Sequence, residues 1–508
     1  MLINTHLPSS ENPDSWHHSS MKIRTTTAIV VSVLTTLASP AGAFVCPRLE
    51  TGIDRAMTGW QVPGLAIGIV QNDKIVYRGT FGVRDTDTGV NVTAKTVFAT
   101  GSITKSLTAL GAAIAATEGK IGLDHPVRRI LAYFPKGISL RHLLSQSAGW
   151  PRHDALWYLD RYSQHELPQM LSLLPRLTPG GQTFQYNNVP FAAAGIALAH
   201  ATGASWNDWV KAKILTPAGM TGAVTTLSGF RNTTDRASPY FPSDTGRITL
   251  PLRDTDPVAP AAGLYAHLDD MLRYVELLAH DGIVGGHRVV PAAPVESLRQ
   301  PVTAGYGMGL RLGEWHGEEL AFHPGFVDGY GARLSILPHR RTGVIVLSNM
   351  SGDTPVSRIV SQIALDCLTG SPPADWVAYF GHRRRSPAAK SPPPAPAGID
   401  RPRIAYSGGF DHPAYGRFEF APVPGSAQLS AKFHGREIIL DYAGKDRWRL
   451  VETRWPLREG LIFAFSSLKR GKFTLLATPL ADGPTYRHNA GPIRFVRTDL
   501  PSRRNNPN

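Results

Sequence analysis

Cysteine is nearly absent from this chain of 508 residues, in which Cys46 and Cys367 are the whole complement. Zinc sites built from paired cysteines are therefore excluded. The 18 histidines do not replace them, because none stands four residues from another, the spacing that places two imidazoles on one helical face. The chain also lacks a glycine-rich loop that could cradle a phosphate. The sequence thus predicts no metal and no other cofactor.

Acidic side chains are also scarce, with 39 aspartates and glutamates against 53 lysines and arginines, which gives a formal net charge of +14. The basic residues are not interleaved with aromatics on a recognisable nucleic-acid module, so the sequence indicates no nucleic-acid partner. The excess charge favours weak association with anionic surfaces such as membranes or wall polymers. A solvated basic face without a partner is the alternative.

Residues 28–37 form an apolar run that is too short to span a bilayer comfortably. A short basic stretch, residues 21–24, precedes it, and the small residues 41–43 follow it, as a signal peptidase requires. Residues 1–43 are therefore predicted to be an N-terminal extension and a signal peptide, with Met21 as the expected start. The mature protein is predicted to be periplasmic or secreted. An N-terminal anchor that is never cleaved is the alternative.

An even pair of cysteines in an exported protein favours a disulfide. Cys46 and Cys367 stand near the two ends of one predicted domain, so a bond between them would close a long loop and stabilise the fold by constraining the unfolded chain. Two buried free thiols are the alternative.

The order of the predicted elements indicates an α+β domain over residues 44–370. Strand-like runs at residues 65–70 and 74–79 predict a hairpin, and a mainly helical middle follows, in which residues 222–260 show no period and are expected to be loop. Further antiparallel strands and a helix at residues 356–368 complete the domain. These strands are expected at residues 306–312, 319–322, 331–337 and 343–348. Both ends of the domain thus build one antiparallel sheet, flanked by helices and set beside a helical subdomain, with the active cleft between them.

Residues 371–400 are rich in proline and arginine and predict a semi-rigid linker. Residues 401–500 alternate short apolar runs with turns and predict a small all-β domain. Its strand-like runs are residues 415–420, 428–433, 437–442, 448–452, 461–465, 472–477 and 493–497.

Ser102 and Lys105 stand three residues apart in a stretch that predicts a helix. This spacing places both side chains on nearly the same helical face. A serine hydroxyl attacks a carbonyl only when a positioned base takes its proton, and a neutral lysine can be that base. Chance supplies about one or two such pairs in a chain of this length, and Ser466 with Lys469 is a second one. That pair ends a predicted strand, where the side chains would project to opposite faces, so we interpret it as an exposed turn.

Two further motifs follow in the chain. Tyr186-x-Asn188 lies in a polar turn ahead of an apolar helix, and a loop tip braced in this way suits catalytic groups. His323-x-Gly325 lies between two predicted strands. A competing His-x-Gly occurs at residues 280–282. It directly follows a predicted helix, which its glycine would end, and it precedes the predicted strands at residues 306–348, so we set it aside.

The order and spacing of the three motifs resemble the penicillin-binding-protein and serine β-lactamase superfamily, in its class C-like branch of D-aminopeptidases, DD-carboxypeptidases and esterases. The resemblance covers about residues 62–368 and implies a β-lactamase-like fold. It is supported by residues 62–64, 143–149, 151–154 and 261–265. The C-terminal β domain resembles small barrels appended to members of this branch.

The resemblance implies that Ser102 forms an acyl-enzyme and that Lys105 accepts or shares its proton. Tyr186, alone or coupled to Lys105, would pass the proton to the leaving group, and Asn188 would hold the substrate amide or carbonyl. The oxyanion would lie between the backbone N–H groups of Ser102 and Phe326.

The His323 motif would contribute to substrate binding. Gly325 is expected to be glycine because its strand must approach the acyl group closely. His323 replaces the lysine of β-lactamases of this type, as in peptidase- and esterase-like relatives, and its charge would be partial and pH-dependent. Pro324 stands where threonine or serine is common, so recognition of a β-lactam carboxylate is not expected to be strong. Arg152, His153 and Asp154 follow a helix end, and they either line the cleft or form a structural ion pair.

Together these features predict an exported, cofactor-independent serine hydrolase that cleaves an amide or ester in a small molecule or short peptide. The export signal and the His323 motif favour D-amino-acid peptides, cleaved in the manner of a DD-carboxypeptidase or D-aminopeptidase. The alternatives are an esterase, a weak β-lactamase and, from another class, a non-catalytic penicillin-binding-like module. The sequence does not indicate an oligomeric state.

Overall fold

The structure is a computed structural model that describes residues 44–158, 162–243, 246–351, 354–384, 398–399, 401–450, 462–468, 472–477 and 493–497. The predicted signal peptide and the start at Met21 lie outside these residues. Among the helices that are described, none is both long and apolar enough to cross a membrane.

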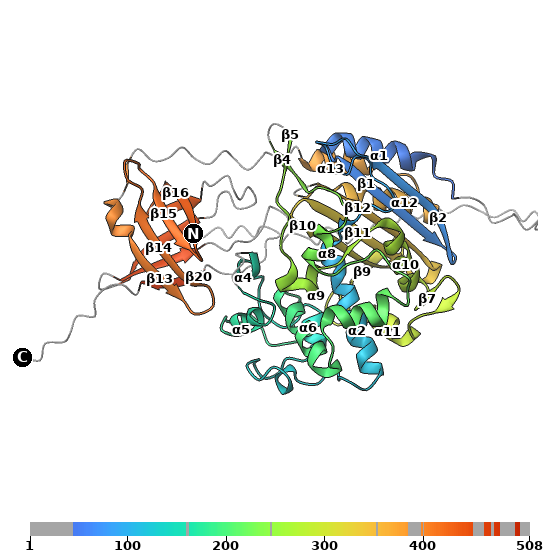
Figure 1. Ribbon diagram of the computed structural model, residues 1–508, viewed down its shortest axis with the longest axis horizontal. Helices are drawn as coiled ribbons and strands as arrows, with labels where there is room; N and C mark the ends of the chain where they lie inside the picture. The colour runs from blue at the N-terminus through green and yellow to red at the C-terminus, as the bar shows by residue number, and fades with distance from the viewer. Residues whose placement is uncertain are drawn as a thin grey trace, which may run out of the picture.

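A six-stranded antiparallel sheet with the strand order β2-β1-β12-β11-β10-β9 forms the upper right of the molecule in Figure 1. Its strands are β1 (Gly64–Gln71), β2 (Lys74–Gly82), β9 (Arg311–Trp315), β10 (Glu318–Val327), β11 (Tyr330–Leu337) and β12 (Thr342–Ser348). β1 pairs with β2 on one side and with β12 on the other, so both ends of the domain meet in the middle of the sheet. The predicted α+β class and the antiparallel sheet are confirmed.

Both faces of this sheet are covered, as the alternation along β1 illustrates. Leu65, Ile67 and Ile69 pack with α1 (Pro47–Trp60) and α12 (Val356–Thr369). Ala66 and Val70, which point the other way, belong to a second core that includes α10 (Leu268–Ala279). Because successive side chains of a strand face opposite sides, a strand buried on both faces reads as a continuous apolar run.

The helical subdomain surrounds α2 (Thr104–Thr117), which is buried from Thr104 to Ala115. A helix that is apolar all round belongs at the centre of a domain, and α2 lies among the other helices below the sheet in Figure 1. The helices that contact it are α3 (Leu140–Leu144), α6 (Val189–Thr202), α7 (Trp206–Val210), α9 (Ala259–Ala262) and α11 (Ala292–Ser297). Two further short helices are α4 (Ala155–Tyr158) and α5 (Glu166–Ser172).

Several segments differ from the prediction. The strand expected at residues 306–312 begins only at Arg311, where β9 starts. Residues 222–260, expected to be loop, contain α8 (Leu227–Arg231) and a hairpin of β4 (Tyr240–Ser243) with β5 (Gly246–Thr249). Elements of four or five residues are too short to show a period. The predicted linker 371–400 begins with α13 (Trp376–Arg384), which packs on α1 and α12. Its proline-rich part, residues 385–397, lies outside the described residues.

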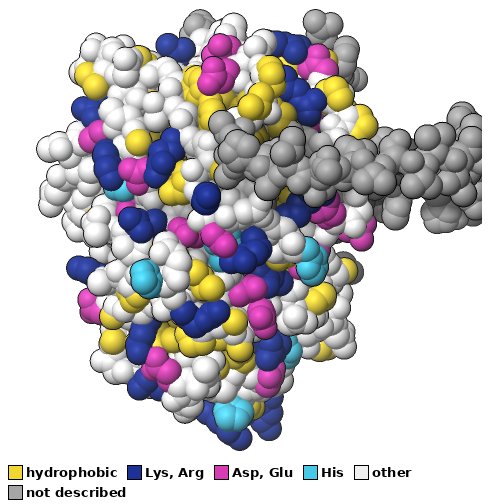
Figure 2. Space-filling view, turned by 90° about the vertical axis from the view of Figure 1, so that its right-hand side faces the viewer, with side chains coloured by type: hydrophobic (Ala, Val, Ile, Leu, Met, Phe, Trp, Pro, Cys, Tyr) yellow, Lys and Arg dark blue, Asp and Glu magenta, His cyan; other side chains and the backbone are white. Residues whose placement is uncertain are grey.

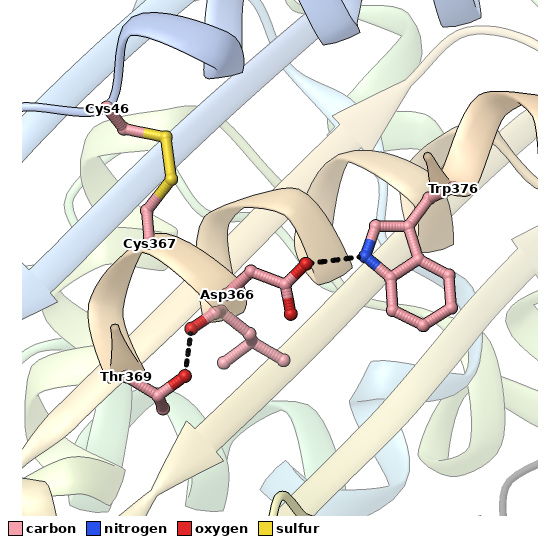
Figure 3. The surroundings of a disulfide bond; sticks show 6 residues. Cys46, Asp366, Cys367, Thr369 and Trp376 are labelled. Atoms are coloured by element: carbon pink, nitrogen blue, oxygen red, sulfur yellow. Dashed lines mark hydrogen bonds between the residues drawn. A yellow bond between two sulfur atoms is a disulfide. The ribbon is translucent and has the colours of Figure 1, made fainter. Parts of the chain in front are cut away.

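Cys46 and Cys367 are joined by a disulfide, so they are not free thiols. Cys46 precedes the first residue of α1, and Cys367 lies in the last turn of α12 (Figure 3). Beside the bond, Trp376 Nε1 of α13 donates to Asp366 Oδ2 at 2.8 Å. The disulfide therefore ties α1 to α12, and α13 packs against these same two helices.

Replacing both cysteines by serine should lower the free energy of unfolding by about 2 to 4 kcal/mol. The bond joins residues that are 321 positions apart, and it stabilises the fold because it lowers the conformational entropy of the unfolded chain. Denaturant unfolding of the parent and of the double variant measures the difference, and reductant added to the parent should reproduce it. Equal unfolding midpoints would show that the disulfide does not stabilise the domain.

The C-terminal region forms a closed antiparallel barrel, seen at the left of Figure 1. Its strands are β13 (Gly408–His412), β14 (Gly416–Pro422), β15 (Leu429–Phe433), β16 (Arg436–Gly444), β17 (Arg447–Leu450), β18 (Ile462–Leu468), β19 (Lys472–Ala477) and β20 (Ile493–Arg497). The predicted all-β character is confirmed. β13 was not among the predicted strands because its sequence, Gly-Gly-Phe-Asp-His, has a single large apolar residue. Ser466 lies within β18, and Lys469 lies outside the described residues.

The basic excess is not gathered into one patch on the face shown in Figure 2, where lysines and arginines are interspersed with acidic side chains. Elsewhere in the chain, several arginines are paired with acidic side chains at the surface, among them Arg78 with Asp269 and Arg340 with Glu318. Association with an anionic surface therefore stays a prediction.

Candidate active site

Ser102 and Lys105 lie where the helical subdomain meets the sheet. Ser102 is in η1 (Gly101–Ile103), a turn of 3-10 helix that leads into α2, and Lys105 is in the first turn of α2. The three-residue spacing brings Lys105 Nζ to 2.9 Å from Ser102 Oγ. Lys105 is 0% exposed, whereas Ser102 is partly exposed. The hydroxyl is therefore accessible, and the amine behind it is shielded from water.

The pKa of Lys105 is lowered well below its usual range, first by burial and then by the positive charge of Arg152. The carboxylate of Asp154 opposes this shift, and the charge of Arg311 adds to it. Lys105 is thus shifted toward the neutral amine, the form in which it can accept a proton.

The hydrogen bonds of Lys105 fit a neutral amine. Besides Ser102, Nζ contacts Asn188 Oδ1 at 2.7 Å and the carbonyl oxygen of Ala261 at 3.1 Å, and both of these atoms only accept hydrogen bonds. A neutral amine has two N–H groups and one lone pair. The two carbonyl oxygens take the N–H groups, which leaves the lone pair for the proton of Ser102. This arrangement can act as a general base.

Tyr186 completes the hydrogen bonding of the serine. Its hydroxyl donates to Ser102 Oγ at 2.7 Å, and burial raises the pKa of Tyr186, which keeps the phenol protonated. Ser102 Oγ therefore accepts a hydrogen bond from Tyr186 on one side and can give its own proton to Lys105 on the other. This places a proton donor beside the nucleophile, close to the carbonyl carbon from which a leaving group would depart.

Asn188 lies beside Lys105, but both ends of its amide are engaged within the protein. Oδ1 accepts from Lys105, and Nδ2 donates to Asp154 Oδ1 at 2.9 Å. The predicted contact between Asn188 and a substrate amide would require one of these bonds to be shared. The sequence placed Asn188 near the nucleophile and singled out Asp154, but it did not connect the two side chains, which are hydrogen-bonded here.

His323 lies in β10 and is 1% exposed. Burial lowers the pKa of His323 well below its usual value, and a positive charge at Lys105 or Arg311 lowers it further. Its Nδ1 lies 2.7 Å from the carbonyl oxygen of Pro324, which can only accept, so this nitrogen carries the proton. Nε2 then accepts from the hydroxyl of Tyr306 at 3.1 Å. The partial charge expected for His323 started from the ordinary pKa of histidine, whereas burial here favours the neutral ring.

The motif around Gly325 is part of β10 and does not lie between strands. β9 pairs with β10 no farther than Phe322, so Pro324 follows the point where this edge becomes unpaired, and its missing N–H costs no ladder bond there. A Cβ on Gly325 would collide with the carbonyl oxygen of Thr100. The glycine is therefore required by the backbone ahead of the nucleophile. The expected close approach of this strand to the acyl group stays a prediction.

The backbones of η1 and β10 approach each other closely at the predicted oxyanion site. A Cβ on Gly101, which has a φ of 55°, would lie 2.6 Å from the backbone nitrogen of Phe326. The amides of Ser102 and Phe326 thus lie on facing segments, where they could bind one oxygen anion. The Phe326 side chain is 38% exposed at the rim.

Arg311 was not predicted as a site residue. It pairs with Phe322 in the sheet, and its guanidinium lies 5.4 Å from the centre of the Phe184 ring. Its charge lowers the pKa values of Lys105, Tyr186 and His323, although larger causes precede it for each. Within the part of the chain that the structure describes, no carboxylate pairs with Arg311. In the sequence it is an ordinary strand residue.

The segment 152–154 lies beside Asn188 and Tyr186, and the barrel contacts it. His153 Nδ1 lies 2.7 Å from the hydroxyl of Tyr415 in the turn between β13 and β14, and the Tyr162 hydroxyl donates to the carbonyl oxygen of Ala414 at 2.9 Å. The competing His280 ends α10 and contacts Asp73 and Arg341 at another edge of the sheet. No group of three histidine, cysteine or acidic side chains that could hold a metal occurs among the described residues.

A protein-family model described as Beta-lactamase matches residues 49–365. Among curated proteins, the chain is 23% identical over 407 residues to the unguisins hydrolase ungD' of Aspergillus campestris, covering 72% of this chain and 75% of that protein. It is 24% identical over 322 residues to penicillin-binding protein 4* of Bacillus subtilis, covering 59% of this chain and 70% of that protein.

Two solved structures share the fold. The octameric penicillin-binding protein homologue from Pyrococcus abyssi has a TM-score of 0.60 and 22% identity, covering 89% of this chain and 99% of that one. The D-amino acid amidase from Ochrobactrum anthropi SV3, in complex with L-phenylalanine amide, has a TM-score of 0.55 and 18% identity, covering 63% of this chain and 99% of that one. At these identities the likeness concerns the fold alone.

Proposed function

The chain belongs to the Beta-lactamase family and is a serine hydrolase, and on this premise we propose that it cleaves D-amino-acid peptides ending in a free carboxylate through an acyl-enzyme on Ser102. The observation that carries the proposal is the pair of hydrogen bonds at Ser102 Oγ, one to a buried lysine and one from a protonated tyrosine. The export predicted from residues 1–43 belongs to the same proposal. The disulfide supports it, because such bonds persist in oxidising compartments.

In acylation, Ser102 Oγ attacks the substrate carbonyl carbon while its proton passes to the neutral Lys105. The oxyanion is held by the backbone N–H groups of Ser102 and Phe326. As the carbon–nitrogen bond breaks, Tyr186 gives its proton to the departing amine and regains one from Lys105, since both side chains meet at Ser102 Oγ. The products of this step are a free amine and an ester on Ser102.

In deacylation, water attacks the same carbonyl carbon, and Tyr186 with Lys105 takes the proton of the water. The ester bond then breaks, Ser102 Oγ regains a proton, and the carboxylic acid leaves. Lys105 ends this step as the neutral amine with which it began, so the chemistry requires no group from outside the protein.

Arg311 supports the choice of a peptide with a free carboxylate. A carboxylate on the substrate would give this cation a counter-charge, and a guanidinium can bind a carboxylate through two parallel hydrogen bonds. His323, neutral in its buried place, cannot supply that charge. Of the two peptidase types, this favours cleavage in the manner of a DD-carboxypeptidase.

Replacing Arg311 by glutamine should lower kcat/KM for a peptide that ends in D-alanyl-D-alanine by about 10- to 100-fold, the usual loss when a charge-assisted hydrogen bond is removed. The C-terminal amide of the same peptide and a p-nitrophenyl ester should change by less than about 3-fold, since neither carries the carboxylate. Arg128→Gln, which removes an exposed positive charge elsewhere, is the matched control.

Equal losses on all three substrates would show that Arg311 supports the fold and not the carboxylate. Hydrolysis of the ester alone, by the parent and the variants, would replace the peptidase proposal with an esterase. Binding of the peptide without turnover of any substrate would favour the non-catalytic module.

A further inference from the structure

Arg152 and Asp154 form a nearly buried ion pair beneath the catalytic groups. Arg152 Nε lies 2.5 Å from Asp154 Oδ2, and the two side chains are 15% and 4% exposed. The guanidinium of Arg152 lies 5.5 Å from the centre of the Tyr186 ring. An ion pair in such a place is expensive to desolvate and is weak evidence for stability, so its position beside the active site needs another explanation.

The carboxylate of Asp154 determines how the amide of Asn188 is oriented. Its Oδ1 accepts from Asn188 Nδ2 and from Trp157 Nε1, both at 2.9 Å. An ionised carboxylate has no proton to donate, so only the NH2 end of the Asn188 amide can face it. The oxygen end must then face Lys105, where it accepts a hydrogen bond at 2.7 Å. If the amide were reversed, its NH2 group would meet Lys105 and compete with Ser102 for the lone pair.

The ion pair also balances the charge around Lys105. Arg152 and Asp154 act on the pKa of Lys105 in opposite directions, and both face it from the same segment. The other charged or titratable groups that face Lys105 are Arg311 of β9, His323 of β10 and Tyr186 of the turn before α6. His323 and Tyr186 are neutral there, so Asp154 is the anion that offsets two arginines.

We propose that Arg152 and Asp154 are positioning residues of the hydrolase, because Asp154 orients the Asn188 amide toward Lys105 and Arg152 compensates the charge of Asp154. This inference rests on the serine-hydrolase assignment and not on the choice of substrate. His153, which stands between Arg152 and Asp154 in the chain, contacts Tyr415 of the barrel. The segment that carries the ion pair is therefore also held by the C-terminal domain.

Two single variants and their combination test this inference. Asp154→Asn keeps the size of the side chain but can turn an NH2 group toward Asn188. It should lower the kcat of p-nitrophenyl ester hydrolysis by about 10- to 100-fold with little change in KM, as a small misplacement of catalytic groups does. The acid limb of its pH profile should move to lower pH, since loss of the anion lowers the pKa of Lys105. In Arg152→Gln the limb should move to higher pH, since loss of the cation raises that pKa.

The double variant Arg152→Gln/Asp154→Asn separates positioning from folding. Without the arginine, the asparagine introduced by Asp154→Asn can keep its oxygen toward Asn188. The double variant should therefore recover most of the kcat lost in Asp154→Asn, with an acid limb between those of the single variants. Thermal unfolding and the rate at which a fluorophosphonate labels Ser102 are measured on all four proteins. The labelling rates should follow the kcat values and not the unfolding temperatures.

Acid limbs that stay in place in both single variants, or kcat losses that follow the unfolding temperatures, would overturn the inference and leave a structural ion pair. If the parent cleaves the ester and reacts with the fluorophosphonate but leaves D-peptides intact, the proposed substrate fails while this test keeps its meaning. A parent that reacts with neither probe would overturn both.

Discussion

Replacing Lys105 by methionine is expected to lower kcat by about 10²- to 10⁴-fold, the usual contribution of a positioned general base. Methionine fills nearly the same space but has no lone pair basic enough to take the proton of Ser102. In the parent, activity should rise with pH as Lys105 loses its proton, because only the neutral amine is a base. Since the pKa of Lys105 is lowered by burial, this rise should lie well below the usual range of a lysine. The Lys105→Met variant should lose this rise of activity with pH.

Stability should change much less than activity, because two effects oppose each other. Lys105 is 0% exposed, and an apolar side chain in its place avoids burying an amine. Asn188 Oδ1 and the carbonyl oxygen of Ala261 lose a donor, however, so Lys105→Met should unfold within a few degrees of the parent. Lys120→Met, an exposed change just after α2, is the control and should alter neither property. A kcat close to that of the parent would remove Lys105 from the mechanism.

Replacing Ser102 by alanine should have the largest effect on activity, a loss in kcat/KM on the order of 10⁵- to 10⁶-fold, as for other covalent serine enzymes. The partly exposed hydroxyl contributes little to folding, so the unfolding temperature should hardly change. Ser106→Ala is a matched control one turn farther along α2, where the hydroxyl donates to the carbonyl oxygen of Ile103 and contacts Tyr274. That variant should lose some stability and keep its activity per folded molecule.

A Ser102→Ala protein that retains more than about a thousandth of the parent kcat/KM would point to another nucleophile. Stopped assays with the same p-nitrophenyl ester, at equal protein concentration, allow the two alanine variants to be compared directly.

The local spacing of residues predicted the centre of the site. A spacing of three residues brings Ser102 and Lys105 together on one helical turn. The order of the motifs, through its resemblance to the penicillin-binding-protein superfamily, placed Tyr186 and Asn188 nearby. The structure joins these side chains by hydrogen bonds at Ser102 Oγ and Lys105 Nζ. The sheet built from both ends of the domain was predictable for a similar reason, because runs such as β1 and β12 are apolar throughout.

Features that depend on burial could not be predicted in this way. The neutral state of His323 follows from its 1% exposure and from Tyr306, which the sequence does not connect with it. The orientation of Asn188 depends on Asp154, 34 residues earlier in the chain. Arg311 gains its significance from the lack of a nearby carboxylate among the described residues, which no spacing in the sequence reports.

Ser102 is expected to be the residue that becomes acylated, with Lys105 as its base. Intact-mass measurement after incubation with a fluorophosphonate, on the parent and on Ser102→Ala, shows whether it is. We predict one adduct per parent chain, located by peptide mapping on Ser102, slower labelling in Lys105→Met, and no adduct in Ser102→Ala. An adduct that persists in Ser102→Ala, or a parent that never gains mass, would contradict the account.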